Sequence, residues 1–129
     1  MIVSRRDRAA LSPAVPGQPA IRSSAAATPS LGSQSLWLVR QRAPAGAAGP
    51  LHAHDRDEAV VVLRGAATLT LGDRSERLEA GDLAVVPAGQ AHQLEADPEQ
   101  ETEWLIVSDP AIRFLLADGQ EHPRPAWAD

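Results

Sequence analysis

The sequence contains no cysteine, tyrosine, lysine or asparagine, so all 12 of its basic residues are arginines. Without cysteine there are no disulfides, no thiolate metal ligands and no cysteine nucleophile. Without lysine and tyrosine there is no Schiff-base amine and no tyrosine general base. Any chemistry must therefore depend on His, Asp, Glu, Ser, Thr, Arg or a bound metal ion.

Long apolar runs and an excess of positive charge are also missing. The longest uncharged apolar stretches, such as Ala59–Leu63 and Leu83–Pro87, fall far short of the roughly 20 residues that a membrane-spanning helix needs. The net charge of -5 favours repulsion of phosphate backbones over their binding. We therefore expect neither a membrane protein nor a nucleic-acid partner.

The N-terminal region has few features of an export signal. Arg5, Arg6 and Arg8 resemble the charged start of such a signal, but residues 11–17 lack the continuous apolar stretch that should follow it. Absence of cysteine also fits a reducing compartment. These features predict a cytoplasmic protein.

A chain of 129 residues has the length of one domain. Residues 1–34 are rich in Pro, Ser, Ala and Arg without a regular period, which predicts an irregular arm with room for one edge strand. Residues 35–129 are predicted to form one antiparallel all-β barrel with an extended, Pro-rich C-terminal tail. Apolar runs there alternate with turn signals, and the expected strands are Leu36–Arg42, Leu51–His54, Glu58–Leu63, Thr68–Leu71, Glu76–Leu78, Leu83–Val86, His92–Ala96 and Glu103–Val107.

Two spaced motifs carry the candidate chemistry. They read Gly46-x5-His52-x-His54-x3-Glu58-x6-Gly65 and Gly81-x5-Pro87-x-Gly89-x2-His92. Side chains two residues apart on a strand share a face, so His52 and His54 point into a barrel together. Glu58 opens the next strand with the same parity, and closure of the barrel would bring His92 to them. Three imidazoles and one carboxylate suit a divalent first-row transition metal better than Mg²⁺ or Ca²⁺.

These two motifs resemble those of the cupin superfamily, over about Leu36–Val107. The resemblance implies a jelly-roll β-barrel, one divalent metal held by His52, His54, Glu58 and His92, and turn-forming roles for the motif glycines and Pro87. Cupin metals include Fe, Mn, Ni, Cu, Co and Zn, and the ligand set does not choose among them. The sequence departs from the family at Ala96, where the second motif often has an asparagine that is not a ligand.

The resemblance also implies a function. A metal with four protein ligands keeps an open position, so we expect an enzyme acting on a small enolic, phenolic or hydrophobic molecule, with Glu58 as ligand and general base. The reaction would be either oxygenase-type or a redox-neutral polyketide cyclisation or isomerisation. Absence of tyrosine and cysteine disfavours cupin lyases with a tyrosine base and thiol dioxygenases with a Cys-Tyr crosslink. The alternative is a non-catalytic module that binds a metal or a small molecule.

The roles expected of other residues follow from the face of the strand on which they lie and from their chemistry. Val60, Val62 and Leu94 share the ligands' parity and are expected to line an apolar pocket. Three arginines are candidates to bind a carboxylate or an enolate, with solvent exposure as the simpler interpretation; they are Arg40, Arg42 and Arg64.

Several residues are expected to have structural or solvent-exposed roles only. His122 and the segment Asp55–Asp57 are predicted to be solvated, and His122 is not expected to be a fifth ligand. Trp37, Trp104 and Phe114 are predicted to serve packing more than substrate stacking. The sheet edges and the N-terminal arm predict a homodimer, with Trp127 near the contact.

Overall fold

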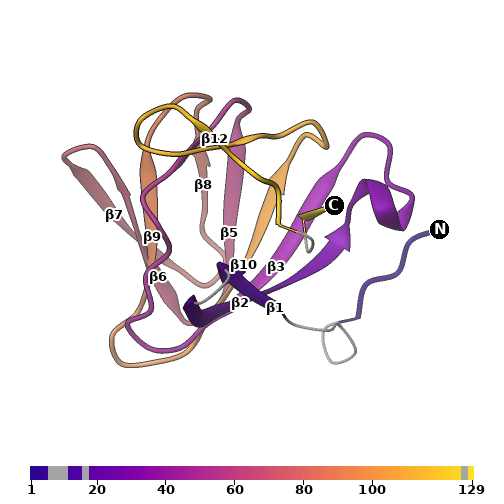
Figure 1. The fold of residues 1–129 in the computed structure, drawn as a ribbon. Helices are drawn as coiled ribbons and strands as arrows, with labels where there is room; N and C mark the ends of the chain where they lie inside the picture. The colour runs from indigo at the N-terminus through magenta and orange to yellow at the C-terminus, as the bar shows by residue number, and fades with distance from the viewer. Residues whose placement is uncertain (6–11, 16–17, 126–127) are drawn as a thin grey trace.

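Twelve short strands account for almost all regular structure in the computed structural model (Figure 1), which describes residues 1–5, 12–15, 18–125 and 128–129. The one helical element described is a single 3-10 turn, η1 (Pro29–Leu31). Every strand pairing is antiparallel, and the strands form a jelly-roll barrel, which confirms the predicted fold class. Across these residues no helix has the length and apolar character needed to cross a membrane.

The largest sheet has six strands in the order β1-β2-β3-β10-β5-β8. Strands distant in sequence are neighbours here, because β10 lies between β3 and β5. The bounds are β1 (Ser12–Val15), β2 (Gln18–Ala27), β3 (Trp37–Ala43), β5 (Glu58–Arg64), β8 (Leu83–Val86) and β10 (Thr102–Ser108).

Two three-stranded sheets complete the barrel. The first, in the order β7-β6-β9, stands opposite the large sheet on the left of Figure 1 and consists of β6 (Ala66–Leu71), β7 (Arg74–Glu79) and β9 (His92–Ala96). The second, in the order β12-β11-β4, lies across one end and consists of β4 (Ala53–His54), β11 (Phe114–Leu115) and β12 (Glu121–His122). The predicted strand over Leu51–His54 is thus shorter than expected, and the C-terminal tail contains two short strands.

The N-terminal segment is more regular than its composition suggested. β2 pairs with β3 along most of its length and is therefore an interior strand of the large sheet, while β1 pairs with β2 at the edge. The prediction of an irregular arm was wrong for these residues, because pairing with the following strand, β3, overrides the weak strand preference of Ala and Ser. Residues 6–11 of this segment and Trp127, which was expected near a dimer contact, lie outside the described residues.

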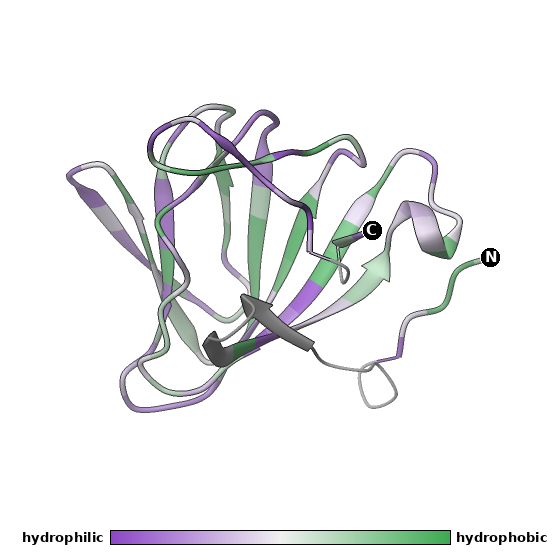
Figure 2. Cartoon of the chain, viewed as in Figure 1, coloured by the Kyte–Doolittle hydropathy of each residue, from purple (hydrophilic) through white to green (hydrophobic). Residues whose placement is uncertain are grey.

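Alternation along the strands places the hydrophobic core inside the barrel. On β3 the residues at positions 37, 39, 41 and 43 are buried and the residues between them are partly exposed. Figure 2 shows the hydrophobic colour concentrated on the long strands of the large sheet, whereas many connecting loops are hydrophilic. The main core cluster includes Val60, Leu69, Leu94 and Trp104 from four different strands. The burial of these side chains holds the facing sheets together.

Two tight connections depend on glycine. Gly72 and Asp73 form the two-residue turn between β6 and β7, as predicted, and Gly72 has a φ of 59°. Gly65 joins β5 to β6 with a φ of 74°, and a Cβ atom there would lie 2.6 Å from the carbonyl oxygen of Glu101. Gly65 therefore permits a close backbone approach that other residues would block.

Candidate metal centre

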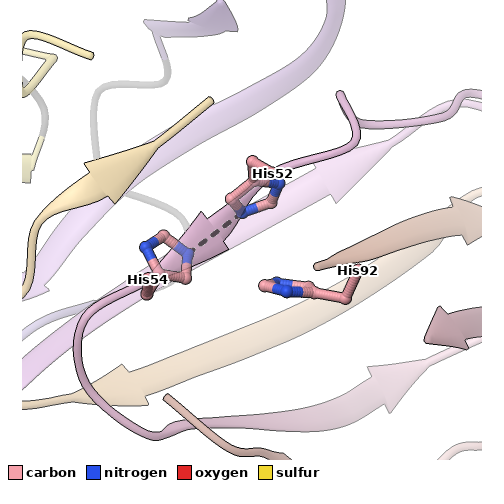
Figure 3. A group of neighbouring side chains, drawn as sticks. All are labelled: His52, His54 and His92. Atoms are coloured by element: carbon pink, nitrogen blue, oxygen red, sulfur yellow. Dashed lines mark hydrogen bonds between the residues drawn. The ribbon is translucent and has the colours of Figure 1, made fainter. Parts of the chain in front are cut away.

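Three histidines meet inside the barrel (Figure 3), and their nearest ligand atoms all lie within 4.8 Å of one another. His52 precedes β4, and an isolated bridge joins it to His92, the first residue of β9. The bridge consists of two backbone hydrogen bonds, from His52 N to His92 O (3.1 Å) and from His92 N to His52 O (2.8 Å). His54, two residues along the chain, presents its ring on the same side as His52.

The tautomer of each histidine ring is fixed by a backbone carbonyl that is bonded to its Nδ1 atom. A carbonyl oxygen only accepts hydrogen bonds, so an Nδ1 atom bonded to one must carry the proton, and Nε2 of the neutral ring is then a free lone pair. All three Nδ1 atoms have such a partner: His52 Nδ1 donates to Pro50 O (2.8 Å), His54 Nδ1 to Arg113 O (3.1 Å) and His92 Nδ1 to Gln90 O (3.0 Å). The three Nε2 atoms are therefore the ones available to a ligand.

A carboxylate shares this centre. Glu58 Oε2 lies 2.9 Å from His54 Nε2, and Glu58 Oε1 lies 3.4 Å from His92 Nε2. His54 Nε2 is also 3.0 Å from His52 Nε2. Lone pairs at these distances repel one another, so a positive charge is needed between them, which is either a proton on one of the rings or a cation.

The geometry fits a metal ion better than a proton. A proton on one ring can serve only some of these close contacts, whereas one metal ion can bind the three nitrogens and the carboxylate together. Metal–nitrogen bonds are about 2.0–2.1 Å long, so two nitrogens at a right angle around one ion lie about 3.0 Å apart. That is the separation between the Nε2 atoms of His52 and His54. Neutral imidazoles and one carboxylate are ligands that divalent transition metals accept.

Burial and neighbouring charges set the protonation states. Burial, helped by His92 and His54, lowers the pKa of His52 to about 4, so its ring is neutral at pH 7. For Glu58 burial alone would raise the pKa, but hydrogen bonds from His54 and His92 outweigh it and lower the pKa to about 2. The carboxylate is therefore ionised and can bind a cation.

The four groups face a cavity of about 250 Å³. Its walls are mostly apolar and come from several strands, and they include Ile21, Trp37, Val60, Leu94, Trp104, Ile106, Phe114, Leu115 and Leu116. Val60 and Leu94 line the cavity as predicted, whereas Val62 is buried in the core and is not among the lining residues. Trp37 and Trp104 are buried packing residues, as predicted, and they also form part of the cavity wall.

The three candidate arginines do not reach this cavity. Arg40 and Arg42 belong to the partly exposed row of β3, which faces away from the barrel interior. Arg40 Nη1 donates to Glu103 Oε1 at 2.9 Å, and Arg42 Nε lies 3.8 Å from Glu103 Oε2. Arg64 lies at the exposed end of β5, beside the same carboxylate. They are therefore not available to bind a substrate carboxylate at the histidines.

Asp55 was expected to be solvated, but its side chain is only 13% exposed. Its Oδ1 accepts a hydrogen bond from Arg113 N (2.7 Å), and its Oδ2 accepts one from Arg113 Nε (2.8 Å). The carbonyl of this same Arg113 holds His54. Arg56 and Asp57 are exposed as expected, and so is His122, although His122 also contributes to the cavity wall.

The polar residue Gln41 was not among the cavity residues predicted from the sequence. Gln41 is buried, lines the cavity and lies in the same buried row of β3 as Trp37. The alternation over Leu36–Arg42 was the available signal, because a glutamine with the parity of an inward tryptophan is expected to face the core.

An antiparallel barrel with a cluster of histidines directed into its interior is typical of small β-barrel proteins that hold a metal ion inside the barrel. A family model describing a cupin domain matches residues 39–108. The chain belongs to the cupin family. The recognition made from the two motifs is therefore confirmed.

Comparison with known proteins gives one curated relative and several related structures. The chain is 36% identical over 100 residues to a Myxococcus xanthus protein named endoribonuclease YbeY. The match covers 78% of this chain but 33% of that protein, so the chain spans about a third of the length of this relative.

The related structures share the fold at low sequence identity. The polyketide cyclase RemF from Streptomyces resistomycificus has a TM-score of 0.77 at 21% identity, over 95% of this chain and 82% of its own. KdgF from Halomonas sp. has a TM-score of 0.72 at 24% identity, over 84% and 94%. A salicylate 1,2-dioxygenase from Pseudaminobacter salicylatoxidans has a TM-score of 0.67 at 20% identity, over 79% and 32%.

Proposed function

We propose that this cupin binds one divalent transition metal through His52, His54, His92 and Glu58 and acts there on a small organic molecule. The proposal rests on three histidine Nε2 atoms that converge on one ionised carboxylate. The Nδ1 atom of each of these three rings is bonded to a backbone carbonyl. Fe, Mn, Ni, Cu, Co and Zn are all compatible with this donor set.

The bound metal would supply Lewis-acid polarisation of a substrate oxygen. The protein groups have separate tasks. The histidines hold their lone pairs in a fixed direction, and the apolar walls keep water away from the reacting molecule. Glu58 serves first as a ligand, because a carboxyl group with a pKa near 2 is a weak general base at neutral pH. Its role as general base would require it to leave His54 and His92.

The cavity favours a flat, oxygen-bearing substrate of phenolic or enolic type. Aromatic and aliphatic walls suit an apolar ring system, and the metal ligands provide the site for one oxygen atom. Related folds include a polyketide cyclase and a salicylate dioxygenase, which supports either a redox-neutral cyclisation or isomerisation or an oxygenase-type reaction.

A binding module without turnover is the second candidate. The pairing of Glu58 with His54 and His92 favours it, because the group best placed to move a proton is already engaged by these two rings. In that case the barrel would hold its ligand for sensing or storage.

We do not propose that this chain has the endoribonuclease activity in the name of the Myxococcus xanthus protein. The match covers 33% of that protein, and the net charge of -5 disfavours an RNA backbone.

Metal analysis of protein purified without an affinity tag is the direct experiment. We expect one equivalent of a transition metal in the wild type and less than a tenth of that in His92→Ala. Aerobic turnover of a panel of phenols and enols by each metal form then separates the enzyme from the binding module. A wild type without stoichiometric metal after incubation with all six candidate ions contradicts the proposal.

We also infer a cytoplasmic homodimer. The strand β8 is an edge of the large sheet and carries exposed Leu83 and Val85, which favours pairing with a second copy. Sedimentation velocity should give twice the 13.6 kDa chain mass at micromolar concentration, and a monomer throughout that range contradicts the dimer.

A further inference from the structure

The cavity wall carries one buried polar side chain besides the four metal-site groups, and it belongs to Gln41. His122, the other polar side chain among the lining residues, is exposed. A buried amide in an apolar wall is costly unless its hydrogen bonds are satisfied. What Gln41 binds therefore determines what the cavity can accept.

Two neighbours fix the orientation of the amide. An indole nitrogen is only a donor, so the Gln41 atom 2.7 Å from Trp104 Nε1 must be the oxygen, Oε1. Gln41 Nε2 then donates one hydrogen to Ser23 Oγ at 2.8 Å. An amide nitrogen carries two hydrogens, so the second one remains for a partner in the cavity.

We propose that Gln41 is a specificity-determining residue that donates this second hydrogen to an oxygen acceptor on a neutral, flat substrate. This inference rests on the proposed function, in which a different oxygen of the same molecule faces His52, His54 and His92. The substrate class is thus an aromatic or polyenolic compound with two oxygens, one directed to the metal site and one to Gln41.

The charges around the cavity favour a neutral molecule over a carboxylic acid. The nearby arginines of β3 face away from the interior and lie beside Glu103, so no arginine side chain is among the described cavity-lining residues. Away from the metal, a substrate carboxylate would therefore be buried in this wall without an arginine partner.

The size of the cavity limits the substrate to a molecule of about two rings. A cavity of about 150 Å³ is enough to admit benzene. At about 250 Å³ this cavity has room for a larger flat molecule of about two rings.

Binding of matched probes tests the proposal without relying on catalysis. Trp37 and Trp104 line the cavity, so their fluorescence should report ligand entry. The full-length protein is titrated with 1-acetylnaphthalene, a neutral ketone, and with 1-ethylnaphthalene, which has nearly the same shape but no acceptor. The titrations are made after metal removal with a chelator and repeated with added zinc, so that failure of metal binding is distinguishable from failure at Gln41.

We expect the metal-free wild type to bind the ketone about 3- to 10-fold more tightly than the hydrocarbon, which corresponds to one net hydrogen bond. Gln41→Leu should bind both probes equally. The double variant Gln41→Leu/Trp104→Phe removes both members of the indole hydrogen bond, so that only Ser23 Oγ loses its partner, and it replaces the single variant if that one fails to fold. The double variant should also bind the two probes equally, and the fluorescence of Trp37 then reports binding.

Two results would overturn the proposal. The first is equal binding of the two probes by the wild type, or a preference for the ketone that survives in the folded Gln41 variants. The second is tighter binding of 1-naphthoate than of 1-acetylnaphthalene by the metal-free protein, which would contradict the neutral substrate class.

Discussion

Asp55 and Arg113 lie 58 residues apart in sequence and are joined by two hydrogen bonds, through the backbone nitrogen and the Nε atom of the arginine. Because the carbonyl of Arg113 holds the Nδ1 atom of His54, the carboxylate fixes a metal-site histidine through one intermediate residue. Partners of this kind orient a ligand ring and fix its tautomer.

We predict that Asp55→Asn weakens metal affinity by about 10-fold, because an amide retains one acceptor but places a second donor against Arg113. Isothermal titration with zinc measures the change. Glu76→Gln is the matched control, since it makes the same replacement at an exposed ion pair with Arg74 and should leave affinity unchanged. Equal affinities for wild type and Asp55→Asn would show that Arg113 stays in place without the carboxylate.

Loss of a metal-site histidine should affect binding far more. His52→Ala should lower metal affinity by more than the roughly 10- to 100-fold typical of outer contacts, because a ligand itself is lost. The apolar walls remain, so circular dichroism should still show a β-rich fold. Added metal should raise the melting temperature of the wild type and not that of the variant.

His122→Ala serves as the comparison for these variants. His122 is exposed, its Nδ1 atom bonds to Pro123 O, and it is not part of the cluster of His52, His54 and His92. Metal affinity and thermal stabilisation by metal should therefore equal those of the wild type. A large loss of metal in this variant would mean that the ligand set is incomplete.

The metal-free protein should lose stability in acid in two steps. The pKa of His52 is lowered from 6.5 to about 4, so the unfolded chain binds more protons between these values and stability falls as the pH drops from 6.5 to 4. Glu58, lowered from 4.5 to about 2, adds a second loss below pH 4.5. The pKa of His92 is raised, because its hydrogen bond with Glu58 outweighs burial, so its contribution is complete below pH 6.5 and adds no slope in this range.

Urea unfolding of the metal-free protein, followed by tryptophan fluorescence at several pH values, measures this profile. His52→Ala should have a flatter profile between pH 6.5 and 4 and keep the loss below pH 4.5. A wild-type stability that is constant from pH 6.5 to 4 would contradict the burial of a neutral His52.

Gly65→Ala should destabilise the fold more than Gly81→Ala. Both glycines have a positive φ, of 74° and 96°, so both variants carry the strain of a left-handed residue, about 1–2 kcal/mol. Only at Gly65 would the new Cβ meet a backbone atom, the oxygen of Glu101 at 2.6 Å, whereas nothing lies within 4 Å at Gly81. Thermal melts of the two variants give the difference, and equal melting temperatures would show that the Gly65 turn can move.

Local patterns in the sequence predicted the parts of the fold that depend on neighbouring residues. The period of 2 located most of the barrel strands, and the His52-x-His54 spacing placed two rings on one face because strand geometry fixes it. Contacts between distant segments were not predictable in this way. The pairing of β10 with β3 and the hydrogen bonds of Asp55 to Arg113 depend on tertiary proximity, which a single sequence does not contain.

The residues of the cavity come from two parts of the sequence. The histidines and Glu58 lie inside the stretch 39–108 that matches the cupin domain, whereas Ile21, Phe114, Leu115 and Leu116 lie outside it. Ser23, which holds the amide of Gln41, also lies outside it. Part of the cavity wall thus lies outside the matched stretch, while Gln41 lies inside it. Replacing Ile21 and Leu116 with residues of other sizes should change which molecules enter and leave the metal preference intact, because neither side chain belongs to the metal site.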